Sequence, residues 1–230
     1  MKSALTIIFS FLLIGSALAQ KTADEVVAKV IDAMGGKEKL QSIKSVKKLG
    51  QLDVGGQKIP FNYYCINNKA EKTEYTFSGL TGYQVVTKDS GYNFNPFQGM
   101  QTPERMTVED LKQSQDELDQ QGVLLDYASK GHAVELLDRE DVDGVDAIQL
   151  KINLSSGKTL FYYIDPDNYY IIRIKIKGKS NGQEFTNTSD FYNFKKNKDG
   201  ILFAYTQDNI TFDSIEINSA IDEKTFEVKK

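Results

Sequence analysis

The sequence predicts a mainly β (α+β) fold, an antiparallel sheet of about ten or eleven strands. The clearest signal is in residues 146–177, where two runs of alternating apolar and polar residues flank the run 159–164, which is apolar on both faces. Residues 155–157 and 165–168 have the composition of tight turns. Links this short force neighbouring strands to be antiparallel, so this part of the chain predicts a meander.

The other elements follow in order. Thr22 stands three residues before Glu25, the spacing of a capping box, and an apolar stripe over 26–34 predicts a helix ending at Gly35. A short helical turn is expected at 38–43. Strands are predicted at 46–54, 58–66, 71–77, 82–87, 92–95, 133–137, 146–154, 159–164, 170–177, 185–194 and 201–217, the last with a bend near Asp208-Asn209.

Residues 95–130 interrupt the strands. Thr107 with Asp110 predicts a capped helix running to about residue 120, and an apolar piece at 123–127 predicts a second helix that ends at Gly131. A helical insertion of this kind is a lid over a cavity or a plain cover for a sheet face, and the residues leave both open. The candidate lid side chains are Met106, Leu111 and Leu118.

Residues 1–19 predict a secretory signal peptide. Lys2 precedes the apolar run 4–18, and Ala17-Leu18-Ala19 has the small residues of a cleavage site. The apolar run is shorter than the roughly 20 residues of a membrane span, and no cysteine follows it to carry a lipid. We therefore expect an exported chain without an anchor, in which residues 20–230 form one domain.

Composition and motifs argue against several function classes. The net charge of −4 at pH 7 disfavours a nucleic-acid partner. His132 is the only histidine, so no histidine-based metal cage can form, and the acidic turn 138–146 does not fit a calcium loop. Cys65 is the only cysteine and has the spacing of a buried strand residue. The sequence therefore predicts no enzyme, no metal and no cofactor.

Aromatic side chains are the positive signal. The chain has 13 Phe and 12 Tyr without Trp, and many of them alternate along the predicted strands. A wide sheet with such a face either fills its interior or encloses a cavity for an apolar ligand, and both remain open at this point. The candidate cavity residues are Phe61, Tyr63, Tyr75, Phe77, Tyr83, Phe203 and Tyr205, together with Ile148, Leu150, Ile152, Tyr170, Ile172 and Ile174 of the meander.

Four stretches resemble one group of exported proteins. They are residues 23–45, Asn95-Pro96-Phe97-Gln98-Gly99, Tyr163-Ile164-Asp165-Pro166 and Asp199-Gly200-Ile201-Leu202-Phe203. In this order they resemble the Bacteroidetes-type proteins described as outer-membrane lipoprotein-sorting proteins, which are similar to the LolA/LolB superfamily. That fold is an open antiparallel β-barrel, wrapped round helices that close a hydrophobic cavity for lipoprotein acyl chains. The group usually has proline soon after Gly-Ile-Leu-Phe, where this chain has Ala204.

The resemblance favours a lid and a cavity over a filled interior. It implies a monomeric periplasmic carrier, or chaperone, that binds the acyl chains of lipoproteins or another lipid during outer-membrane lipoprotein sorting. Envelope proteins are its expected protein partners. The alternative is an envelope sensor or interaction module that uses the same fold to bind a protein or lipid without transporting it.

Overall fold

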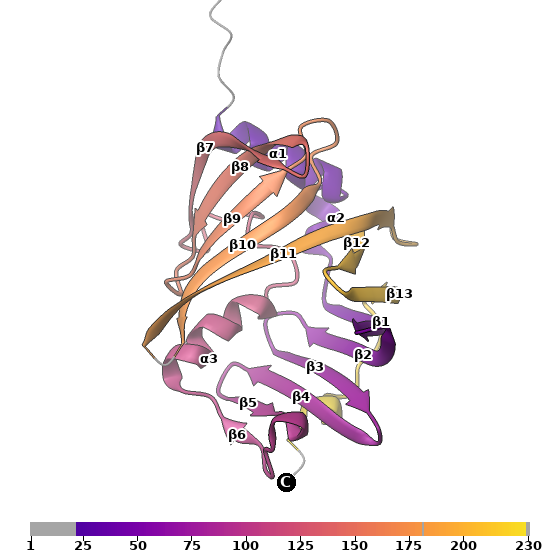
Figure 1. The fold of residues 1–230 in the computed structure, drawn as a ribbon. Coiled ribbons are helices and arrows are strands. Elements are labelled where there is room, and N and C mark those ends of the chain that lie inside the picture. The colour runs from indigo at the N-terminus through magenta and orange to yellow at the C-terminus, as the bar shows by residue number, and fades with distance from the viewer. Residues whose placement is uncertain (1–21, 181, 229–230) are drawn as a thin grey trace, which may run out of the picture.

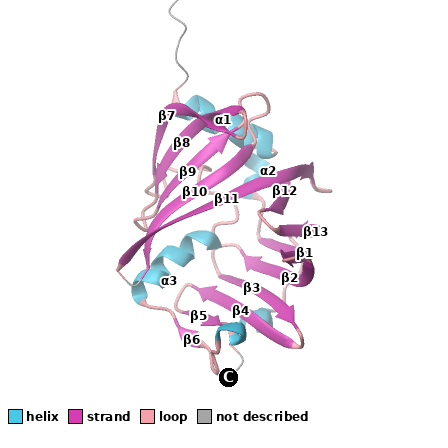
Figure 2. Ribbon diagram, viewed as in Figure 1, coloured by secondary structure: helices cyan, strands magenta, loops and turns pink. Residues whose placement is uncertain are grey.

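The computed structural model describes residues 22–180 and 182–228, so the predicted signal peptide lies outside the described residues. Within these ranges thirteen strands form one antiparallel sheet, in the order β6-β5-β4-β3-β2-β1-β13-β12-β11-β10-β9-β8-β7. The sheet curls around helix α3 (Val108–Ser114) and stays open, because its edge strands β6 and β7 do not pair with each other (Figures 1 and 2). The predicted open, curved sheet is confirmed.

The elements have the following bounds. The strands are β1 Ser45–Val54, β2 Gln57–Ile66, β3 Ala70–Phe77, β4 Leu80–Thr87, β5 Gly91–Phe94, β6 Glu104–Arg105, β7 Ala133–Val142, β8 Val145–Asn153, β9 Thr159–Ile164, β10 Ile171–Ser180, β11 Gln183–Lys196, β12 Leu202–Gln207 and β13 Ile210–Ile217. The helices are α1 Ala23–Met34, α2 Lys37–Gln41 and α3 Val108–Ser114, and the 3-10 turns are η1 Pro96–Gln98, η2 Gln115–Leu118 and η3 Glu223–Phe226.

The sheet has more strands than the sequence predicts, for two reasons. The expected bend at Asp208-Asn209 is a hairpin turn, with Asp208 at a positive φ of 50°, so the predicted strand 201–217 becomes the pair β12 and β13. The two-residue strand β6 pairs with β5 and has no periodicity that a sequence pattern could reveal. The order of the eleven predicted strands is otherwise retained.

Helix α1 forms where the capping box places it. The Thr22 hydroxyl accepts a hydrogen bond from the Glu25 backbone N–H, and the Glu25 carboxylate accepts one from Thr22 N–H. Its apolar stripe is buried through Val26, Val27 and Val30. Among the described residues no helix has both the length and the apolar character to cross a bilayer.

The predicted second helix at 123–127 is wrong. This segment is a series of turns, closed by hydrogen bonds such as Leu125 N–H to the Gly122 carbonyl, and Asp126 has a positive φ of 51° that interrupts a helix. The turns send adjacent side chains into different cores: Leu124 packs with α1 and β8, and Leu125 packs with α2 and β13. In the predicted helix, Leu124 and Leu125 would both belong to one apolar face and would pack into the same core.

One face of the sheet packs against α1, α2 and the turns 119–131, and we call it the inner face. It has one core under α1 and a second under α2. The opposite, outer face has its own clusters, one of which is covered by Phe226 from η3 near the C-terminal end. Phe226 thus anchors the C-terminal part of the described chain to the outer face.

Gly50 is required at an irregularity between β1 and β13. The pairing register of β1 with β13 shifts between Leu49 and Gly50. A Cβ at Gly50 would lie 2.2 Å from the Thr211 carbonyl oxygen and 2.8 Å from the Phe212 Cα. We expect Gly50→Ala to destabilise the protein by about 3 kcal/mol, because only the backbone could move to relieve the contact. Urea unfolding measures this.

The matched control is Gly82→Ala. Its Cβ would meet only the side-chain ring of Tyr75, 2.6 Å away, and a ring can rotate. Gly82→Ala should therefore cost clearly less than Gly50→Ala, and equal costs would contradict the interpretation.

Candidate functional site on the inner face

The inner face is apolar across β7–β10. Leu136, Leu150, Tyr162 and Ile174 lie opposite one another in successive strands and form one row beneath α1. Leu150 is fully buried and Tyr162 nearly so. The predicted cavity residues Ile148, Leu150 and Ile152 are thus brought together, but they form closed core under α1 instead of lining open space.

The same face is polar across β2–β5. Tyr63, Thr73, Gln84 and Asn93 lie opposite one another in a row, and Glu71 lies opposite Cys65 in the next row. This half borders a cleft of about 380 Å³. The cleft is lined by Gln84, Asn93, Met106, Asp110, Gln113, Ser114, Glu117, Lys158, Lys179, Ser180, Phe185 and Asn187. Amide and charged groups dominate it, so it offers no shelter for an alkyl chain.

An apolar pocket of about 170 Å³ lies between these halves, walled chiefly by β10–β13 and the end of α1. Three predicted cavity residues line it: Tyr170, Ile174 and Phe203. The full lining is Met34, Lys48, Tyr170, Ile171, Ile174, Phe191, Phe194, Leu202, Phe203, Ala204, Gln207 and Phe212. Lys48 is the one charged side chain in this set.

Several predicted cavity residues lie elsewhere on the inner face. Phe61 and Tyr205 pack against the core beneath α2, and Tyr63 joins a polar network described below. Tyr75 and Phe77 pack on Phe97 of η1, with ring centroids 5.6 and 6.2 Å away, at the end of the sheet. The side chains that line the pocket are therefore a minority of the predicted set.

Two predicted cavity residues are on the outer face. Tyr83 lies opposite Glu74, not Tyr75, and packs with Val85 and Phe226. Ile172 packs outward against Tyr163, because a bulge between Ile171 and Arg173 shifts the alternation of β10. The prediction that Tyr83 and Ile172 line a cavity is therefore wrong. Which face a residue is on depends on the register between strands, and the alternation within one strand does not reveal that register.

The helical insertion predicted to begin at Thr107 is present as α3 and η2, and polar contacts attach it to the sheet. Figure 1 shows α3 lying between β10 and β4. Gln113 donates to the Lys179 carbonyl at 2.6 Å, and Gln115 donates to the carbonyls of Thr87 and Lys88. Leu118 is buried, whereas Met106 and Leu111 pack near Gly91, and none of these three predicted lid residues lines the apolar pocket.

Turn η2 braces the two halves of the inner face. On one side the Asp116 carboxylate accepts from the Ser156 hydroxyl at 2.6 Å and pairs with Lys158 at 3.3 Å. On the other side Gln120, two residues after η2, donates a hydrogen bond to the Tyr63 hydroxyl at 2.7 Å. Because Lys158 is buried, this ion pair is screened little by solvent.

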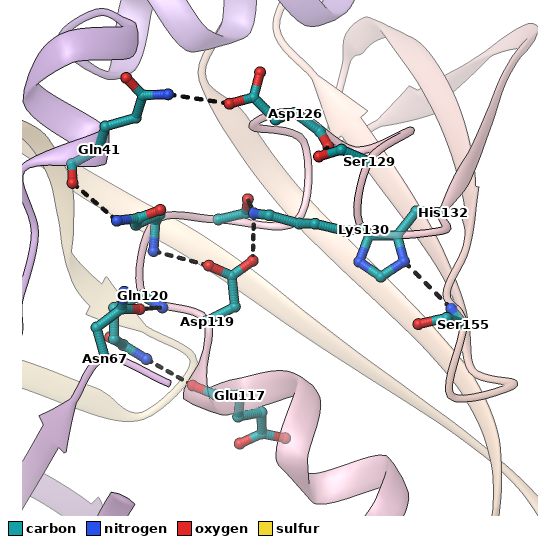
Figure 3. A network of polar contacts seen from close by, with 12 residues as sticks. Gln41, Asn67, Glu117, Asp119, Gln120, Asp126, Ser129, Lys130, His132 and Ser155 are labelled. Atoms are coloured by element: carbon teal, nitrogen blue, oxygen red, sulfur yellow. Dashed lines mark hydrogen bonds and ion pairs between the residues drawn. The ribbon is translucent and has the colours of Figure 1, made fainter. Parts of the chain in front are cut away.

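The turns that follow η2 are tied to α2 by the same kind of contact (Figure 3). Gln41 donates to the Asp126 carboxylate at 3.1 Å, and Lys130 pairs with Asp119 at 2.6 Å. His132, just before β7, accepts a hydrogen bond from the Ser155 N–H through Nδ1. Burial lowers the pKa of His132.

Ionisable groups gather where the halves meet, and Glu71 is the buried one among them. Burial, and next the charge of Glu117, raises the pKa of Glu71 to about 8, and burial also raises the pKa of Glu117. Burial lowers the pKa of Lys48 on β1. Tyr63 donates to the Glu71 carboxylate at 3.3 Å. Glu71 is thus protonated in a large fraction of molecules at neutral pH.

Cys65 belongs to this region and is inert. It is fully buried, its thiol lies 4.0 Å from the Leu118 carbonyl, and burial raises its pKa to about 12. The prediction of a small buried side chain is confirmed. Within the described ranges, no group of three His, Cys, Asp or Glu side chains is arranged to hold a metal ion.

Sequence reasoning did not find Lys48, Glu71, Glu117 and Lys158. Lys47 and Lys48 occupy both phases of one strand, so alternation could not show that one of them faces inward. The four residues are far apart along the chain, and only the curling of the sheet brings them near one another.

No profile of a known protein family matches the sequence, and no curated protein matches it. Solved structures do match the fold. A LolA superfamily protein from Nitrosomonas europaea has a TM-score of 0.52 at 11% identity, over 90% of this chain and 98% of that one. A domain described as outer membrane lipoprotein-sorting, from Vibrio parahaemolyticus, has a TM-score of 0.50 at 12% identity, over 89% and 97%. The chain therefore has the fold of the LolA superfamily.

Proposed function

We propose that this chain is a non-enzymatic periplasmic carrier that shelters an acyl chain of a lipoprotein or another lipid. The observation that carries this proposal is the apolar pocket of about 170 Å³ on the inner face of a LolA-like sheet. The similar domain from Vibrio parahaemolyticus, described as lipoprotein-sorting, supports the choice of ligand. Export to the periplasm rests on the predicted signal peptide at 1–19.

The pocket sets the scale of binding. A cavity of roughly 150 Å³ holds a group the size of benzene, so the pocket takes about six carbons as it stands. At about 0.8 kcal/mol for each buried methylene, these contribute about 5 kcal/mol before the costs of binding. A longer chain needs more room, and Met34 is the flexible side chain whose displacement extends the pocket toward α1.

The attachment of α3 and η2 suits reversible uptake. Gln113, Gln115 and Asp116 hold this segment by hydrogen bonds and an ion pair, groups that water can replace when the segment detaches. Opening then exposes the polar cleft without unfolding the core under α1. This is the step at which we propose that cargo enters and leaves.

Ile174→Asp should abolish binding of a fluorescent fatty-acyl probe to lipid-free protein. The substitution places an unpaired carboxylate in the apolar pocket, which weakens binding at least about tenfold. The matched control is Ile172→Asp, the same change on the same strand at a half-buried site of the outer face, and it should retain binding. Circular dichroism checks that both variants fold.

Two results would remove the carrier proposal: wild-type protein that binds no acyl probe, or equal binding by wild type and Ile174→Asp. Mass spectrometry of material extracted from natively purified protein then identifies the cargo.

The second candidate is an envelope sensor or interaction module. A surface groove between α1 and the turns 124–129 favours it, because apolar side chains such as Val27, Ile31 and Leu124 line it. Native protein that yields no lipid but forms a stable one-to-one complex with an envelope protein would favour this candidate over the carrier.

A further inference from the structure

Lys48 is a cation on an apolar wall. It projects from β1 onto the inner face, where its ammonium lies 5.0 Å from the ring centroid of Tyr63 and 5.4 Å from that of Phe212. Tyr63 comes from β2 and Phe212 from β13, the two strands that flank β1. Lys48 is therefore held from both sides at the centre of the curled sheet.

The ammonium of Lys48 has no ion-pair partner among the described residues. The carboxylates that act on it are those of Glu71 and Glu117, and neither comes within the 4.0 Å of an ion pair. Glu71 holds its proton at neutral pH to a large extent, because burial raises its pKa to about 8. The ring faces of Tyr63 and Phe212 stabilise the cation only in part.

The surroundings of Lys48 select a ligand class. The pocket is lined by apolar and aromatic side chains, with Gln207 as the only other polar residue and no carboxylate in the set. A half-buried cation without an ion-pair partner is costly, so a ligand anion that reaches Lys48 gains a charge-assisted contact in a largely apolar site. An alkyl chain attached to that anion fills the rest of the pocket.

We propose that Lys48 binds the anionic end of the ligand, so that the pocket takes an anionic amphiphile, a carboxylate or phosphate carried on an alkyl chain. This inference rests on the proposed acyl-binding function and adds the polar end of the ligand to it. The alkyl chain then extends past Ile174 toward Met34.

The test compares ligands that differ only in the head group. Decanoate, decyl phosphate and decanol, each below the concentration at which it forms micelles, are titrated calorimetrically into lipid-free protein at pH 7.5. Wild type should bind decanoate or decyl phosphate at least about tenfold more tightly than decanol. Lys48→Met should bind decanol as wild type does but lose the preference for the anions, and Lys48→Arg should retain most of it.

Each outcome decides the question. Equal affinity of wild type for decanol and both anions, or a preference that survives in Lys48→Met, overturns the inference while leaving acyl binding in place. No binding of any of the three ligands by wild type ends the proposed function as well. Loss of decanol binding in a folded Lys48→Met protein assigns Lys48 to the structure of the pocket and also overturns the inference. A tenfold preference for decyl phosphate over decanoate indicates a phospholipid source, and the reverse indicates a fatty acid.

Discussion

Glu71→Gln should abolish most of the loss of stability that the wild-type protein shows between about pH 5 and pH 8. Glu71 is 2% exposed, and burial, with Glu117 second, raises its pKa from 4.5 to about 8. Between these values the unfolded chain has released its proton while the folded chain keeps it. The contribution of Glu71 to the free energy of unfolding is therefore highest below about pH 4.5, and it falls until the pH has passed about 8.

The effect is large because each pKa unit corresponds to about 1.4 kcal/mol, so a loss of up to about 4 kcal/mol is expected across this window. Glutamine retains an oxygen that accepts from the Tyr63 hydroxyl, which keeps the local contact. Urea unfolding at pH 5, 6, 7 and 8 measures the change. Glu184→Gln, an exposed glutamate on β11, is the control and should follow the wild-type curve.

A wild-type stability that stays level from pH 5 to pH 8 would show that Glu71 ionises normally. An equal slope in wild type and Glu71→Gln would assign the pH dependence to another group, with Glu117 the first to examine, because burial raises its pKa in the same direction.

Asp116→Ala should destabilise the protein by about 3–5 kcal/mol, because it leaves the buried ammonium of Lys158 without its partner. It also removes the acceptor of the Ser156 hydroxyl. The loss should be concentrated in α3 and η2, since this carboxylate is the contact that joins η2 to the turn before β9. Urea unfolding gives the total, and hydrogen exchange of residues 108–120 gives the local part.

A double variant separates the effect of the unpaired Lys158 charge from the effect of losing the Asp116 side chain. Lys158→Met in the Asp116→Ala background should restore most of the stability, because no buried charge then lacks a partner. The control is Glu135→Ala, which breaks the exposed ion pair with Lys151 and should change stability by less than about 1 kcal/mol. A similarly small loss in Asp116→Ala would mean that η2 is not braced through Lys158.

Local sequence patterns predicted most of the fold. The capping box at Thr22 places α1, and the turn residues of 155–157 and 165–168 connect β8, β9 and β10 as expected. These elements depend on contacts between residues close in the chain, so a local pattern contains the necessary information. The LolA-like fold and the open sheet are consistent with the resemblance of the four sequence stretches.

The candidate site was predicted less well. Tyr170, Ile174 and Phe203 do line the pocket, but Tyr83 and Ile172 face outward because of strand register and the bulge in β10. The faces of a strand are defined relative to its neighbours, and a slip of one residue exchanges them.

The sequence by itself determined that short links fold an antiparallel sheet with an apolar face, because tight turns and alternation act within a few residues. The tertiary structure alone decided that half of the inner face is polar and that Lys48 and Lys158 come near enough to Glu71 for their charges to act on it. These groups come from β1, β3 and the turn before β9, and their charges act on one another only across the space that the curled sheet encloses.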